Sequence, residues 1–164
     1  MNKKLKIKII ETIMHAGEGH IPSSFSIIDI IDYLYSKVLK INKRNFKNKN
    51  RNYFILSKGH GCVALYVVLE KIGIISNFDL INFCSNKGIL GGHPDKTKIP
   101  GVEASTGSLG HGLPTAVGIA LGLKIKKKLN KVFVLLGDGE SQEGTIWESA
   151  NIAANLNLNN LCVV

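Results

Sequence analysis

The segment Lys131–Glu148, KVFVLLGDGESQEGTIWE, most strongly constrains what this chain can fold into. Its first part, Val132–Leu136, is short, apolar and rich in β-branched residues, which is typical of a strand buried on both faces of a parallel sheet. Gly137 and Gly139 allow a sharp turn and a close approach of the backbone to a ligand, and Asp138 places a carboxylate at the end of the strand. Open α/β sheets bind their ligands at this edge.

Two interpretations of this Gly-Asp-Gly turn remain open at the level of the residues. A hard cation such as Mg²⁺ prefers oxygen ligands like those of Asp138, and a helix that begins near Ser141 offers N–H groups to a phosphate. An ordinary strand-to-helix turn with a solvated aspartate explains the tripeptide equally well. The turn alone therefore does not decide between a metal and phosphate site and a plain loop.

Length and composition indicate one domain with a substantial core, since the chain has 164 residues of which 45% are hydrophobic. Apolar stretches such as Ile27–Leu39 and Cys62–Leu69 are too short or too interrupted by polar residues to cross a bilayer. The N-terminus has no apolar signal core after its lysines. We therefore expect a cytoplasmic protein without a membrane partner.

The net charge of +9 raises nucleic acid as a possible partner, because basic residues are dense between Lys37 and Arg51. Phe46 is the only aromatic residue in that run, and no nucleic-acid-binding module is recognisable. We therefore expect a solvated basic loop and no nucleic-acid partner. The same positive field would attract sugar phosphates and a diphosphate cofactor.

Strands and helices alternate along the chain. Hydrophobic spacing predicts helices over Leu5–His15, Ile27–Leu39, Gly61–Ile72, Phe78–Cys84, Leu113–Leu129 and Thr145–Leu156. Short apolar runs predict strands over Tyr53–Ser57, Val132–Leu136 and Leu161–Val164. This order indicates an α/β fold, a parallel sheet with helices on both faces. Ser24 or Ser26 is expected to cap the second helix. The long irregular segment Asn86–Gly107 is of a kind that is usually functional.

Four of the five histidines directly follow a glycine, namely His20, His60, His93 and His111. Each lies in or beside a loop, where a flexible backbone could bring imidazoles to one cleft. Such a set suits proton transfer and hydrogen bonding to phosphate, although each histidine taken singly is more commonly a structural or surface residue. A zinc cluster has little support, because no Cys pair and no His-x-x-x-His spacing accompanies them.

From Glu18 to Val164 the chain resembles the diphosphate-binding half of transketolases, above all those encoded as separate N- and C-terminal subunits. The resemblance rests on four segments in this order, GEGHIPSSFSIIDIIDYLY, YFILSKGHGCVALY, GGHPDKTKIPGVEASTGSLGHGL and VFVLLGDGESQEGTIWESA. Deoxyxylulose-phosphate synthases share the Gly-Asp-Gly turn, but the sequences of the SKGH and PGVEASTGSLG segments resemble those of transketolases. The resemblance implies the thiamin diphosphate-binding fold, with residues 1–164 as a single diphosphate-type domain.

The resemblance also implies a reaction, the transfer of a two-carbon ketol unit from a ketose phosphate to an aldose phosphate. Thiamine diphosphate with Mg²⁺ would serve as the cofactor, and Asp138 would be the metal ligand. His60 would hydrogen-bond the diphosphate, and the backbone around Gly107 and Leu109 would line the cofactor's rings. The full set of cofactor-binding positions carried over is His60, Gly107, Leu109, Gly137, Asp138, Gly139 and Glu140.

Four residues match catalytic positions of the family. His20 and His93 correspond to histidines that contact the donor hydroxyls and the ketol unit. Glu143 and Glu148 correspond to glutamates in a hydrogen-bonded network at the interface between protein chains, although two carboxylates near a helix N-terminus can also simply stabilise its dipole. His111 is expected to be structural.

The resemblance finally implies dependence on other chains. In the family the last motif continues into a metal-binding Asn, and this sequence ends at Val164 before that position. We therefore expect an incomplete domain that binds metal weakly and completes no turnover alone. The implied partner is a C-terminal transketolase subunit with the pyrimidine-binding domain, in a homo- or hetero-oligomer. The alternative is a non-catalytic or regulatory remnant of a transketolase subunit.

Overall fold

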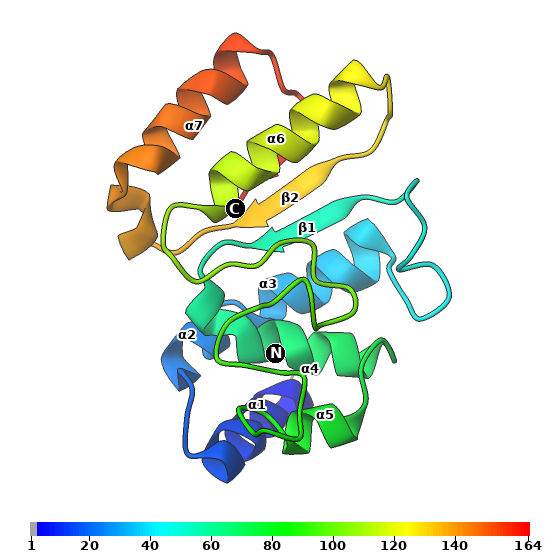
Figure 1. Ribbon diagram of the computed structural model, residues 1–164, viewed down its shortest axis with the longest axis vertical. Helices are drawn as coiled ribbons and strands as arrows, with labels where there is room; N and C mark the ends of the chain where they lie inside the picture. Colours follow the sequence, from blue (N-terminus) through cyan, green and yellow to red (C-terminus); the bar gives the residue numbers. More distant parts are fainter. Residues whose placement is uncertain (1–2) are drawn as a thin grey trace.

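The computed structural model describes residues 3–164 and contains a three-stranded parallel sheet between two layers of helices (Figure 1). The strands are β1 (Tyr53–Leu56), β2 (Val132–Leu135) and β3 (Leu161–Val163), and they lie in the order β1-β2-β3. Tyr53 pairs with Val132, which in turn pairs with Leu161. Because the strands are parallel, the segments that follow β1 and β2 emerge at the same edge of the sheet.

The side chains of β1 and β2 alternate between two buried clusters. Phe54 and Leu56 of β1 pack in one cluster, and Ile55 between them packs in the other. Successive side chains of a strand point to opposite faces, so this division places apolar side chains on both faces of the sheet. The prediction of a parallel sheet with helices on both faces is therefore confirmed, with β1 and β2 buried on both sides and β3 exposed at Cys162 and Val163.

The helices of the two layers are unequal in number. On one face lie α1 (Lys3–Ala16), α2 (Ile21–Phe25), α3 (Ile28–Tyr33), α4 (Cys62–Lys71) and α5 (Asn77–Ile81). On the other face lie α6 (Gly112–Ile125) and α7 (Gly144–Asn155). In the larger layer α4 is buried from Cys62 to Leu69, so it forms the centre of the core there. Within residues 3–164 none of the helices has the length and apolar character needed to cross a bilayer.

The predicted helix Ile27–Leu39 is interrupted. It begins as α3, ends at Tyr33 and continues as a π-helical turn over Leu34–Leu39, which closes at a left-handed Lys40 with φ of 52°. The expected serine cap is wrong, because the residue before α3 is Ile27 and no side chain caps the helix. The short α2, which hydrophobic spacing does not predict, starts with Pro22 in its first turn, where proline is favourable.

The segment Asn86–Gly107 is irregular as predicted, although α5 already ends at Ile81 and not at the predicted Cys84. Hydrogen bonds attach the irregular segment to the core. Thr106 Oγ1 donates to the backbone oxygen of Leu56 at the end of β1, at 2.7 Å. Tyr66 Oη of α4 donates to the backbone oxygen of Gly91 at 2.9 Å. This irregular segment is therefore attached to the end of β1 through Thr106 and to α4 through Gly91.

Candidate functional site

A cleft of about 400 Å³ lies at the carboxyl ends of β1 and β2. Its lining residues come from four separate parts of the sequence and are Pro22, Ser23, Ser26, Lys58, His60, Leu109, Gly137, Asp138, Gly139 and Glu140. Each of the four motif segments contributes at least one of them. The fold therefore brings the four motifs to one place, at the edge where parallel α/β sheets bind ligands.

The loops around the cleft approach each other at backbone distance. A Cβ atom at Gly59 would lie 2.8 Å from the backbone nitrogen of Gly107, closer than real Cβ atoms come. A Cβ atom at Gly107 would lie 2.9 Å from Cδ2 of His93. Glycine at these two positions therefore allows the SKGH turn, the irregular segment and the ring of His93 to pack directly on one another.

Three of the predicted histidines converge beside the cleft. The rings of His20 and His60 meet edge-on, with centroids 5.6 Å apart and planes at 83°. Burial lowers the pKa of His60, and the positive charges of Lys58, His20 and His93 lower it further. His20 and His93 are exposed, so both rings are open to a ligand.

His111, the fourth glycine-linked histidine, does not line the cleft. Its Nδ1 is 3.0 Å from the backbone oxygen of Leu109, and its ring is exposed. A second hollow, of about 500 Å³, is lined by both His111 and His93 together with the segment Ser105–Ser108. The hydrogen bond to its own loop agrees with a structural role for His111.

The acidic residues of the last motif occupy different environments. Asp138 is exposed at the cleft, whereas Glu140 is only 2% exposed. Glu143 directly precedes α7 and Glu148 lies in its second turn; both are exposed and neither lines the cleft. Of the catalytic and binding glutamates predicted from the resemblance, only Glu140 is therefore part of the cleft wall.

Lys58 belongs to the cleft, although the sequence motifs did not single it out. Its Nζ donates to Ser26 Oγ at 3.1 Å. Burial lowers the pKa of Lys58, while the negative charges of Asp138 and Glu140 act in the opposite direction. Its place in the SKGH turn, directly before the pair Gly59-His60, is the signal that could have revealed it.

The cleft residues fit a diphosphate and a shared divalent cation. Lys58 and His60 supply hydrogen-bond donors. The backbone at Gly139 is accessible, because a Cβ atom there would meet nothing within 4 Å. Asp138 supplies one carboxylate. In the described part of the chain no group of three or more His, Cys, Asp or Glu could hold a metal by itself. Magnesium bound with phosphates commonly uses one or two carboxylates, and Asp138 is an exposed carboxylate that the cleft offers to such an ion.

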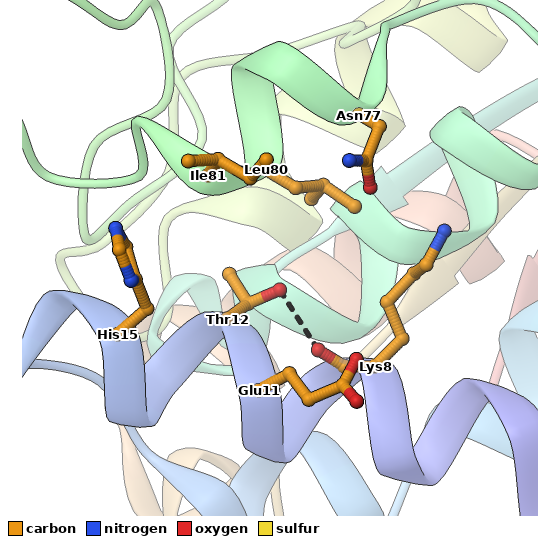
Figure 2. A pocket seen from close by; sticks show the side chains of 7 residues that line it. All are labelled: Lys8, Glu11, Thr12, His15, Asn77, Leu80 and Ile81. Atoms are coloured by element: carbon orange, nitrogen blue, oxygen red, sulfur yellow. Dashed lines mark hydrogen bonds between the residues drawn. The ribbon is translucent and has the colours of Figure 1, made fainter.

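A separate cavity of about 270 Å³ lies away from this edge, between α1 and α5 (Figure 2). In Figure 2 the side chains of His15 and Thr12 on α1 face Leu80 and Ile81 of α5. Thr12 Oγ1 is already bonded to a backbone oxygen of its own helix, that of Lys8, at 2.8 Å. No residue of the four motif segments lines this cavity, so it is distinct from the candidate site.

A parallel α/β domain with a charged cleft at the ends of its strands has the architecture of a domain that binds a phosphorylated cofactor. Comparison with known protein families agrees with this. The model described as "Transketolase, thiamine diphosphate binding domain" matches residues 1–164, and the chain belongs to this family.

Relatives with curated descriptions include components of split transketolases. The chain is 41% identical to one subunit of the apulose-4-phosphate transketolase of Actinobacillus succinogenes, over 97% of this chain and 57% of that protein. It is 37% identical to 6-deoxy-6-sulfo-D-fructose transketolase subunit SqwG of a Clostridium species, over 93% of this chain and 55% of that protein. The chain therefore spans little more than half the length of these relatives.

Solved structures with the same fold include complete transketolases. The transketolase of Campylobacter jejuni superposes with a TM-score of 0.83 at 30% identity, over 98% of this chain and 27% of that chain. The transketolase of Leishmania mexicana gives a TM-score of 0.79 at 29% identity, over 97% and 25%. The predicted family and the predicted fold are thus both confirmed.

Proposed function

We propose that this chain is the diphosphate-binding part of a transketolase that transfers a two-carbon ketol unit from a ketose phosphate to an aldose phosphate. The observation that carries the proposal is the convergence of all four motif segments on one cleft at the ends of β1 and β2. The descriptions of the relatives as transketolase subunits support it. A cytoplasmic location is part of the proposal, since its substrates would be sugar phosphates.

The proposed cofactor is thiamine diphosphate with Mg²⁺. When bound, thiamine diphosphate supplies a carbon nucleophile and an electron sink. Asp138 would hold the metal, while Lys58, His60 and the backbone at Gly139 would hold the diphosphate. Leu109 lines the same cleft and would contact the cofactor's rings together with the backbone at Gly107. The turn at Gly137 would bring the backbone close to the diphosphate.

His20 and His93 are proposed to bind the sugar. Both are exposed and both lie near enough to lower the pKa of His60. Their imidazoles could orient the donor hydroxyls and accept or donate a proton at those oxygens. Because burial lowers the pKa of His60, its neutral form is favoured in the cofactor-free protein.

The proposed assembly pairs this diphosphate-binding domain with a C-terminal subunit that carries the pyrimidine-binding domain. Glu143 and Glu148 are exposed at the start of α7 and therefore accessible to another chain. Trp147 between them is 63% exposed, although its Nε1 donates to the backbone oxygen of Ser141 at 2.9 Å. Large exposed aromatic residues are enriched in protein interfaces, so we propose that this end of α7 contacts the partner.

Isothermal titration tests the proposal. The full chain, alone and mixed with its C-terminal counterpart, is titrated with thiamine diphosphate in the presence of MgCl₂, and ketol transfer is then assayed in the mixture. We expect cofactor uptake and turnover in the mixture. Cofactor uptake without turnover would indicate a non-catalytic remnant, and absence of cofactor uptake in the mixture would refute the proposal.

A further inference from the structure

The buried carboxylate of Glu140 holds three loops together. Its Oε1 accepts hydrogen bonds from Ser57 Oγ at 2.5 Å and from the backbone nitrogen of Gly110 at 2.9 Å. Its Oε2 accepts from the backbone nitrogen of Gly137 at 3.0 Å. These donors belong to the turn after β1, the loop before α6 and the turn after β2. One side chain therefore joins segments that are far apart in the sequence.

The network extends one step further on two sides. Ser57 Oγ, which donates to Glu140, accepts from the backbone nitrogen of Gly112 at 3.1 Å. Thr145 Oγ1 donates to the backbone oxygen of Gly110 at 3.0 Å. Gly110 is thus held at both its N–H and its C=O, in a left-handed conformation with φ of 82°. The loop that carries Leu109 is therefore held in place from both sides.

Each residue that donates a hydrogen bond to Glu140 is adjacent in the sequence to a residue that lines the cleft. Ser57 precedes Lys58, Gly110 follows Leu109, and Gly137 precedes Asp138. We propose that Glu140 is a positioning residue that fixes these three cleft residues relative to one another, and that it is not itself a cofactor ligand. This inference rests on the proposed function only in naming thiamine diphosphate as the molecule that the cleft binds.

The chemistry of the three partners requires a carboxylate at this position. The hydroxyl of Ser57 and the backbone N–H groups of Gly110 and Gly137 are all hydrogen-bond donors. An ionised carboxylate offers only hydrogen-bond acceptors. A glutamine has one amide N–H₂ group, which would face one of these donors and leave it unpaired. Unpaired buried polar groups are costly, and hydrogen bonds to a charged group are stronger than neutral ones. The neutral isostere is therefore expected to release at least one of the three loops.

The test compares Glu140→Gln with Glu11→Gln, an exposed glutamate on α1, in the full chain together with its C-terminal counterpart. We expect Glu140→Gln to weaken binding of thiamine diphosphate and Mg²⁺ by about tenfold to a hundredfold. Amide hydrogen exchange in the cofactor-free protein should become faster at Gly110 and Gly137. Glu11→Gln should change neither quantity. A folded Glu140→Gln protein with unchanged affinity and unchanged exchange would overturn the inference.

Ser57→Ala provides a milder second variant if Glu140→Gln does not fold. It removes one bond to the carboxylate and one to Gly112. We expect faster exchange at Gly110 and Gly112 and a smaller loss of cofactor affinity, and unchanged exchange at both amides would contradict the network. Exchange is measured without cofactor, so it tests the network even if the wild-type protein binds no thiamine diphosphate, a result that would count against the proposed function alone.

Discussion

The imidazole of His20 stands edge-on to the imidazole of His60, with ring centroids 5.6 Å apart. His20 directly precedes α2, and His60 lies in the turn between β1 and α4. The contact therefore links a candidate sugar-binding histidine to a candidate diphosphate-binding one. The charge of His20 acts on His60, because His20 is among the groups that lower the pKa of His60.

Cofactor binding should take up a proton at His60. Burial and neighbouring cations lower the pKa of His60 in the free protein, and a diphosphate placed beside it would raise that pKa. Cofactor affinity should therefore fall as the pH rises from about 6 to about 8, in the window around the ordinary histidine pKa. Calorimetry in two buffers of different ionisation enthalpy measures the uptake. His60→Gln should abolish it, and equal uptake in wild type and variant would refute this assignment.

Gly110→Ala should destabilise the protein. The residue has φ of 82°, and a Cβ atom there would overlap Thr145 Oγ1. We expect a loss of at least about 2 kcal/mol in the free energy of unfolding, measured by urea denaturation. Gly118→Ala in α6 is the matched control, because its Cβ atom would meet nothing within 4 Å. That helical substitution should be neutral or stabilise by about 0.5–1 kcal/mol.

Arg51→Met should destabilise the protein more at pH 8 than at pH 5. Arg51 forms a largely buried ion pair with Glu103, and burial raises the pKa of Glu103 although Arg51 opposes that shift. Because the pKa of Glu103 is raised in the folded protein, protonated Glu103 is compatible with the folded state at low pH. Its contribution to the stability of the folded protein is lost as the pH rises through that pKa. Without Arg51 the charged carboxylate is unpaired, and we expect a loss of about 3 kcal/mol at pH 8.

Urea unfolding at the two pH values measures this difference. The double variant Arg51→Met/Glu103→Gln removes the unpaired charge and should recover part of the stability at pH 8. An equal loss for Arg51→Met at both pH values would show that the packing of Arg51 and its hydrogen bonds to the backbone oxygens of Phe46 and Asn52, rather than its ion pair with Glu103, account for the effect.

His93→Ala should impair sugar turnover without loss of cofactor. The ring of His93 packs against Gly107 and is exposed at the second hollow. We expect kcat/KM for ketol transfer by the reconstituted complex to fall by about a hundredfold or more, as for other proton-transfer groups. The dissociation constant for thiamine diphosphate, from titration, should stay within about threefold of wild type. His15→Gln, in the cavity of Figure 2, serves as the control. A comparable fall in that control would mean that the effect is not local.

Much of the fold was predictable because local patterns agree with the tertiary structure. The apolar run before Gly137 is a buried strand, and the glycine after His60 directly precedes the buried helix α4. The break of the helix after Tyr33 was not predictable, because apolar spacing continues unchanged into the π-helical turn.

The cleft was predictable to a smaller extent. The glycine-linked histidines and the Gly-Asp-Gly turn marked its place. The orientation of Glu140 could not be read from its sequence neighbours, because the donors that hold it inside the protein include Ser57 and Gly110 from other loops. Lys58 was missed for the same reason, since the carboxylates that influence it lie beyond the end of another strand.

The shared carboxylate of Glu140 has a consequence for which substitutions this sequence can accept. Gly110 and Gly137 donate through backbone N–H groups, which every residue except proline retains, so Ser57 is the partner whose replacement removes a donor outright. Lineages that replace this glutamate should therefore carry compensating replacements at position 57 or in the loop before α6. Such correlated substitutions can be sought among natural sequences without any further structure.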